Sequence, residues 1–112
     1  MVFVESKLFT KLLPDYLDDD EYRLFQQTLL MRPEIGDLIQ GANGLRKVRW
    51  RIKGKGKRGG IRMIYYFLSS HLRFYMLTIY AKGQVTDLKA DEKKALARLM
   101  QEWKNEQETK FI

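Results

Sequence analysis

The sequence has no cysteine, one histidine and two prolines among its 112 residues. Without cysteine there is no disulfide, no thiolate zinc site and no cysteine nucleophile, which suits a reducing compartment. Apolar runs are short, since VFV at residues 2–4 is followed at once by Glu5 and Lys7. No run reaches the roughly 20 apolar residues of a membrane span, and nothing resembles a signal peptide. We expect a cytoplasmic protein that does not enter membranes.

Acidic residues are also missing from the middle of the chain. Between Asp37 and Asp87 there is none, yet this stretch holds eleven of the 21 Lys and Arg. The flanks hold all 14 acidic residues and only ten basic ones, although the net charge is +7. A basic middle between acidic ends favours a polyanion as the partner.

The first part of the chain predicts a short strand and two helices. Ser6 is a candidate N-cap for a helix that Pro14 ends, and the run DDDE at residues 18–21 favours the start of a second helix. A carboxylate metal site at DDDE is the alternative. Capping is favoured because no histidine or further acid stands nearby to complete a ligand set.

The middle and the end of the chain predict a sheet followed by a helix. GLRKVRWRI alternates apolar and basic residues, and IRMIYYFL and RFYMLTIYA are two further strands joined by the turn SSHL. DEKKALARLMQEWKNEQ has apolar residues at helical spacing. We therefore predict one α+β domain over residues 1–112. Its antiparallel sheet would carry the N-terminal helices and the C-terminal helix on one face, leaving the other face open and basic.

The stretch RIKGKGKRGGIRMIYYF at residues 51–67 joins basic residues to glycines that let a phosphate approach the backbone. It lacks the GxxxxGK[ST] spacing of a nucleotide-binding P-loop. A solvated hairpin tip is the alternative for its lysines. The candidate RNA-binding residues here are Arg51, Lys53, Lys55, Lys57 and Arg58.

Cleavage of RNA without a metal needs a base for the 2′-hydroxyl, cations for the phosphate and a proton for the leaving 5′-oxygen. The single histidine, His71, falls in a predicted turn. A lysine among other cations has a lowered pKa and transfers protons near neutral pH, whereas arginine suits phosphate binding. Tyrosines stack on unpaired bases. Of the strand tyrosines, Tyr66 is our candidate because it shares the parity of Arg62.

Three segments in this order, GANGLRKVRW, GKGKRGGIRMIYYF and YMLTIYAKGQVTDL, resemble the RelE/HigB superfamily of bacterial toxins, and in particular its HigB-like branch. PEIGDLIQGANGLRKVRW and DLKADEKKALARLM extend the resemblance over nearly the whole chain. It implies a RelE-like fold and a type II toxin that cleaves mRNA in the ribosomal A site without metal or cofactor.

The resemblance also implies roles for individual residues. Lys47 and Arg49 match paired basic positions that transfer protons and stabilise the transition state, and Arg62 matches an arginine that holds the phosphate. Lys82 matches a basic residue that stabilises charge or assists the leaving group. Where some members carry a catalytic tyrosine, this chain has Asp87, which either participates or caps the last helix.

The partners implied are the 70S ribosome with its 16S rRNA and mRNA, and a cognate antitoxin. A HigA-like helix-turn-helix antitoxin is expected, and promoter DNA would be bound only through the complex with it. Two other functions remain open. One is a non-catalytic basic module that binds RNA or DNA, and the other is a ParE-like toxin that poisons gyrase. The basic set Lys47, Arg49, Arg62 and Lys82 argues against the second.

Overall fold

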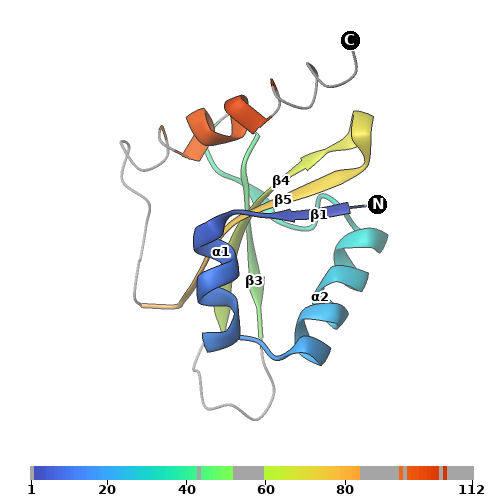
Figure 1. Ribbon diagram of the computed structural model, residues 1–112, viewed down its shortest axis with the longest axis vertical. Helices are drawn as coiled ribbons and strands as arrows, with labels where there is room; N and C mark the ends of the chain where they lie inside the picture. Colours follow the sequence, from blue (N-terminus) through green and yellow to red (C-terminus); the bar gives the residue numbers. More distant parts are fainter. Residues whose placement is uncertain are drawn as a thin grey trace.

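The computed structural model describes residues 2–42, 44–51, 60–83, 94, 96–103 and 105. Its strands are β1 (Val2–Glu5), β2 (Asp37–Leu38), β3 (Arg46–Trp50), β4 (Ile61–Leu68) and β5 (Arg73–Ala81). Its helices are α1 (Lys7–Leu12) and α2 (Asp19–Met31), with 3-10 turns at Leu13–Asp15 and Ser69–His71. Residues 96–103 are also helical. The strands form one sheet in the order β1-β5-β4-β3-β2 (Figure 1).

Both N-terminal helices begin where the sequence predicts. The Ser6 hydroxyl accepts a hydrogen bond from the Phe9 N–H at 2.9 Å and so caps α1. Asp18 and Glu21 form a reciprocal capping box at α2, with distances of 2.8 and 2.9 Å. The DDDE run therefore caps a helix, as expected.

The three long strands are confirmed as an antiparallel meander, β3 to β4 to β5. Two pairings were not predicted. The two-residue strand β2, in a stretch for which no element was predicted, pairs with β3, and β1 runs parallel to β5. β5 also contains a bulge: the pairing jumps from Ile64–Thr78 to Tyr65–Met76, which leaves Leu77 as an extra residue.

Apolar clusters cover the sheet on both faces. The first face carries Met63, Tyr65 and Phe74 and packs against Phe9 of α1 and Phe25 of α2. The second face packs against residues 39–45 and helical segment 96–103, whose members of this cluster are Leu96, Leu99, Met100 and Trp103. Figure 1 shows α1 and α2 on one side of the sheet and segment 96–103 on the other.

This arrangement confirms the α+β class but differs from the expectation that all helices share one face. Alternation explains the difference, because β5 presents Phe74 and Met76 to one side and Tyr75 and Leu77 to the other. Each apolar face of the sheet has to pack against another element, and the N-terminal helices pack against only one of the two faces. Within the described residues, no helix is long and apolar enough to cross a membrane.

Candidate cation site on the second face

Strand register brings three of the predicted catalytic residues onto the second face. Arg49 of β3 pairs with Arg62 of β4, and Lys47 pairs with Ile64 of the same strand. Paired residues in an antiparallel sheet point to the same side. Lys47, Arg49 and Arg62 thus lie together on the face that carries Ile64. With Lys82, described next, we call them the cation group.

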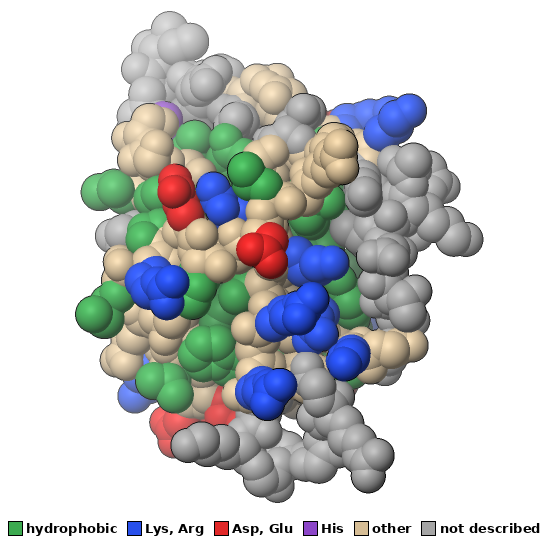
Figure 2. Space-filling model, turned by 180° about the vertical axis from the view of Figure 1, so that it is seen from behind, with side chains coloured by type: hydrophobic (Ala, Val, Ile, Leu, Met, Phe, Trp, Pro, Cys, Tyr) green, Lys and Arg blue, Asp and Glu red, His purple; other side chains and the backbone are tan. Residues whose placement is uncertain are grey.

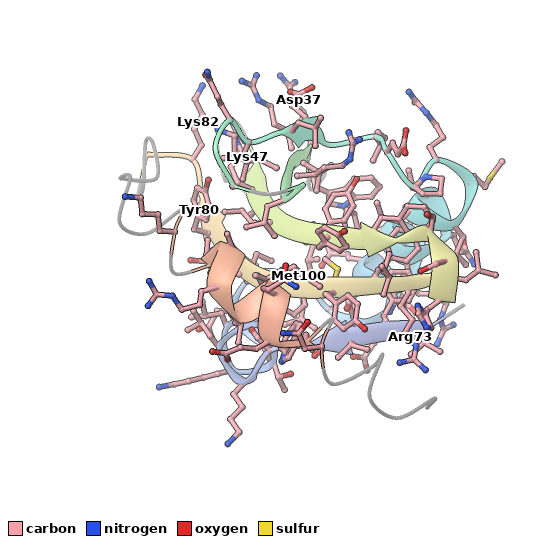
Figure 3. All side chains as sticks on the ribbon, turned by 90° about the horizontal axis from the view of Figure 1, so that it is seen from above. Asp37, Lys47, Arg73, Tyr80, Lys82 and Met100 are labelled. Atoms are coloured by element: carbon pink, nitrogen blue, oxygen red, sulfur yellow. The ribbon has the colours of Figure 1, made fainter. Side chains whose placement is uncertain are left out.

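Lys82 follows directly after β5. Its backbone N–H donates to the Gly60 carbonyl at 3.2 Å, beside the start of β4. Gly60 has φ +72°, and a Cβ there would collide with the Trp50 carbonyl, so only glycine fits this approach of β3 to β4. Figure 3 shows the Lys82 and Lys47 side chains projecting to the same side of the sheet. The fold therefore joins Lys82 to the cation group.

Burial differs among the four cations. Arg62 is only 9% exposed, and its Nη1 donates to the Ile61 carbonyl at 3.3 Å. Lys47 is half-buried, whereas Arg49 and Lys82 are exposed. Arg62 is thus the buried member of the cation group, Lys47 is intermediate, and Arg49 and Lys82 are the exposed members.

The charges of the exposed members are not neutralised by ion pairs within the described part of the chain. The ion pair between Arg46 and Glu34, at 3.9 Å, lies elsewhere, since Arg46 points to the opposite face. Like charges directly opposite each other in a sheet are destabilising, which applies to Arg49 and Arg62. An anion between them would remove that repulsion. Figure 2 shows Lys and Arg side chains gathered in one region of the surface.

The structure describes only some of the other predicted binding residues. Arg51 is exposed just after β3, on the parity of Arg49. Lys53, Lys55, Lys57, Arg58 and Asp87 lie outside the described residues.

Tyr66 shares the face of Arg62, as parity predicts, but it packs into the second apolar cluster about 13 Å along β4. The tyrosine opposite Arg62 is Tyr80 of β5, which is 7% exposed. In a regular strand, residues an odd number of positions apart point to opposite faces. Tyr75 and Tyr80 are five positions apart and still share a face, so parity alone does not predict the position of Tyr80. The bulge at Leu77 turns the strand over between them.

Asp37 is a second residue that sequence reasoning missed. It is exposed and pairs directly with Lys47 across β2 and β3. Figure 3 shows it in the same part of the molecule as Lys47 and Lys82. Strand β2 has only two residues, too few for a periodic pattern to predict it from the sequence.

The segment before Asp37 is fixed by buried groups. The Tyr65 hydroxyl donates to the Pro33 carbonyl at 2.8 Å and accepts from the Gly36 N–H at 3.0 Å. Burial raises the pKa of Tyr65, which keeps its proton available for Pro33. Arg46 Nη1 donates to the Gly36 carbonyl at 2.8 Å. A Cβ at Gly36 would lie 2.9 Å from Tyr65 Cε1, so the backbone is held tightly against β3 and β4.

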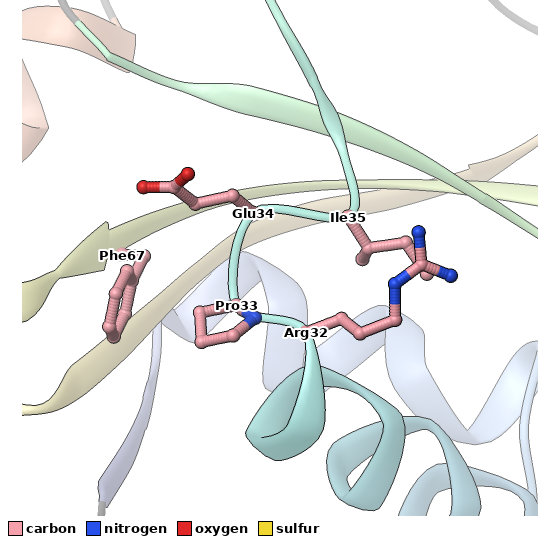
Figure 4. Close-up of a pocket in the computed structure, with 5 residues that line it drawn as sticks. All are labelled: Arg32, Pro33, Glu34, Ile35 and Phe67. Atoms are coloured by element: carbon pink, nitrogen blue, oxygen red, sulfur yellow. The ribbon is translucent and has the colours of Figure 1, made fainter.

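A hollow of about 350 Å³ lies on the first face, away from the cation group. Arg32, Pro33, Glu34, Ile35 and Phe67 line it (Figure 4). Its floor is apolar and belongs to the first cluster through Ile35 and Phe67. Within the described residues no group of three His, Asp or Glu side chains is placed to hold a metal ion.

Comparison with solved structures identifies the fold. A chain in the crystal structure of the intact E. coli RelBE toxin–antitoxin complex matches with a TM-score of 0.55 and 13% identity, covering 74% of this chain and 98% of that chain. The isolated E. coli RelE toxin matches with a TM-score of 0.53 and 13% identity, covering 88% and 97%. No protein-family model matches the sequence. The protein therefore has the RelE fold.

Proposed function

We propose that this protein is the toxin of a type II toxin–antitoxin system, of the HigB-like branch. It acts as a ribosome-dependent endoribonuclease that cleaves mRNA in the ribosomal A site without a metal ion and thereby inhibits translation. It works in the cytoplasm as a single domain and needs no cofactor.

The observation that carries the proposal is the convergence of cations from neighbouring strands of a RelE fold. Arg49 and Arg62 are directly paired across β3 and β4, and Lys47, two residues before Arg49, lies on the same face. Such a cluster binds a phosphodiester and stabilises the charge that builds up on its oxygens during cleavage. RNA carries its own nucleophile, the 2′-hydroxyl, so no nucleophilic side chain is required.

Each cation has a distinct task in this proposal. Arg62 holds the scissile phosphate, and Arg49 stabilises the extra negative charge of the transition state. Lys47 takes part in proton transfer, and Lys82 assists the leaving 5′-oxygen. Ribosomal RNA and the message are bound by the surrounding residues Arg51, Lys53, Lys55, Lys57, Arg58 and Tyr66, and Asp87 is a further candidate for proton transfer.

The partners follow from the same proposal. The substrate is mRNA held on the 70S ribosome next to 16S rRNA. One of the two similar structures is a toxin–antitoxin complex, which supports a cognate antitoxin for this chain as well. A HigA-like helix-turn-helix protein is the antitoxin we propose, with promoter DNA bound through the complex.

One observation favours a second function, a non-catalytic module that binds nucleic acid. Arg62 is only 9% exposed, so most of the accessible positive charge of the cation group belongs to its other members. The exposed Arg49 and Lys82 would then bind RNA or DNA through phosphates alone. Such binding weakens steeply with salt and leaves the nucleic acid intact.

Purified ribosomes programmed with a defined message separate these functions. We expect new RNA ends only when ribosomes are present, and a loss of about 10²-fold in single-turnover rate for Arg49→Ala and Lys82→Ala. Arg23→Ala, an exposed arginine of α2 on the other side of the sheet, is the control for lost charge and should cleave normally.

Bound but uncut message would favour the nucleic-acid-binding module. Broken DNA in the presence of gyrase would favour a ParE-like toxin. Full cleavage by Arg49→Ala and Lys82→Ala proteins would remove the proposed site.

A further inference from the structure

The fold brings one carboxylate to the cation group. Asp37 is the register partner of Lys47, so the two side chains point to the same face with Cβ atoms about 5 Å apart. Arg49 is its diagonal neighbour at about 7–8 Å. The carboxylate therefore stands at the edge of the region where a bound phosphodiester would lie.

The position of Asp37 is fixed by more than its strand pairing. Its neighbour Gly36 is held by two hydrogen bonds, one to the fully buried Tyr65 hydroxyl and one from Arg46. Gly36 also has no room for a side chain. We call the hydrogen bonds from Gly36 to Tyr65 and from Arg46 to Gly36 the clamp, because they hold the backbone next to the exposed Asp37 carboxylate.

Stability alone does not call for this arrangement. A surface pair such as Asp37 and Lys47 contributes only about 0–1 kcal/mol, and the two do not form an ion pair. A proton-transfer group must be held in a fixed position, because proton transfer depends on hydrogen-bond geometry.

We propose that the Asp37 carboxylate is the general base of the cleavage reaction. This assignment rests on the proposed function. The carboxylate takes the proton of the 2′-hydroxyl, the 2′-oxygen attacks phosphorus, and the bond to the 5′-oxygen breaks. The products are a 2′,3′-cyclic phosphate and a 5′-hydroxyl, whose proton comes from the Lys82 ammonium.

The chemistry of the cation group leaves this role open. Arginine stays protonated and does not accept a proton. Lys47 is a cation directly opposite Asp37 in the strand register. This assignment replaces the proton-transfer role that the proposed function gives to Lys47: the lysine stabilises charge, and the Asp37 carboxylate accepts the proton. No histidine lies among the described residues of this group.

The distances agree with that division of tasks. Asp37 and Arg62 are two strands and two residues apart, about 12 Å between Cα atoms. Side chains that reach inward from both positions span a ribose and its 3′-phosphate. The 2′-hydroxyl would lie on the Asp37 side and the phosphate above Arg62.

Asp37→Asn is the test, because the amide keeps the shape of the side chain and does not act as the base. Single-turnover cleavage on ribosomes should fall by about 10²–10³-fold. Asp19→Asn in the first turn of α2 changes the net charge equally and should retain the wild-type rate. A message with a 2′-deoxynucleotide at the cleavage site measures binding, which should be unchanged or tighter for Asp37→Asn.

The pH profile separates a base from a structural residue. A general base gives the single-turnover rate an acidic limb, and Asp37→Asn should lose that limb. Urea unfolding of both variants checks that the fold is retained.

The outcomes distinguish this inference from the proposed function. If wild-type protein cleaves and Asp37→Asn cleaves within about threefold of it, the assignment of Asp37 is overturned and the nuclease stands. A slower variant with an unchanged pH profile, or with weakened binding of the deoxy message, also overturns it. If the wild-type protein does not cleave at all, the proposed function fails first and this inference with it.

Discussion

The two faces of β4 differ in what they bury. Towards α1 and α2 the strand presents Ile61, Met63 and Tyr65, all fully buried in the first cluster. Towards the other side it presents Arg62 and Ile64, so a guanidinium is covered almost as completely as its apolar neighbours. Burying a charge is unfavourable unless it is compensated. At these positions the first face buries apolar and aromatic side chains, whereas the second also buries a guanidinium, which donates to the Ile61 carbonyl.

The first face should respond most strongly to a loss of volume. Phe25 is fully buried and packs edge-on against Trp50, with ring centroids 5.1 Å apart. Phe25→Ala should lower the free energy of unfolding by about 3–5 kcal/mol, measured by urea denaturation. Leu24→Ala, at a neighbouring position that is 58% exposed, should change it by less than about 0.5 kcal/mol. Equal losses would mean that the first cluster does not hold the fold together.

The second face should show the opposite behaviour. Arg62→Met removes the guanidinium and its hydrogen bond to the Ile61 carbonyl but keeps most of the side-chain volume, so stability should fall by no more than about 1–2 kcal/mol. Cleavage on ribosomes should fall by about 10²-fold, because the variant lacks the arginine that is proposed to hold the scissile phosphate. A variant that unfolds easily yet cleaves normally would reverse the roles of the two faces.

Two buried hydroxyls allow a matched comparison between hydrogen bonds that hold the segment beside Asp37 and hydrogen bonds at the start of α1. Tyr65 bridges Pro33 and Gly36, and Ser6 bridges the Phe9 N–H and the Leu77 carbonyl, the latter at 2.7 Å. Tyr65→Phe and Ser6→Ala each leave backbone groups unsatisfied and should lower stability by about 1–2 kcal/mol. Only Tyr65→Phe should also slow cleavage, since it loosens the backbone beside Asp37. Equal cleavage by the two variants would show that the clamp has no part in activity.

Much of the fold follows from patterns that act within a few residues. The strands IRMIYYFL and RFYMLTIYA end where the sequence predicts, because β-branched and aromatic residues stop at polar turn residues. Ser6 and Asp18 cap their helices through side chains that reach only three residues along the chain. Local chemistry of this kind is visible without a structure.

The site depends on contacts that sequence parity does not contain. The bulge at Leu77 brings Tyr80 onto the face of Arg62, and nothing in the strand pattern announces an extra residue. Asp37 lies opposite Lys47 because hydrogen bonds from Gly36 to Tyr65 and from Arg46 to Gly36 hold the preceding backbone against β3 and β4. Parity did place Lys47 and Arg49 on one face of β3, and the strand register then adds Arg62 to the same face.

Alkaline pH should separate the two faces more finely than any of the substitutions above. On the first face, burial and then the charge of Glu5 raise the pKa of Tyr22, whose hydroxyl donates to Glu5 at 3.0 Å. On the second, burial also raises the pKa of Tyr75, but the charge of Arg73 opposes that rise.

A tyrosine whose pKa is raised by folding stabilises the protein fully below its unfolded value of about 10, and that contribution is lost as the pH rises through the folded value. Stability should therefore be level with respect to these groups up to about pH 10 and then decline, by at most about 1.4 kcal/mol per pH unit for each group. Tyr22→Phe should lose about 1 kcal/mol at neutral pH with the hydrogen bond to Glu5, yet flatten the alkaline decline more than Tyr75→Phe does. Urea midpoints at neutral pH and above pH 10 measure both effects. A decline flattened more by Tyr75→Phe would mean that Arg73 does not offset the burial of its neighbour, and that the second face is the one that alkali opens first.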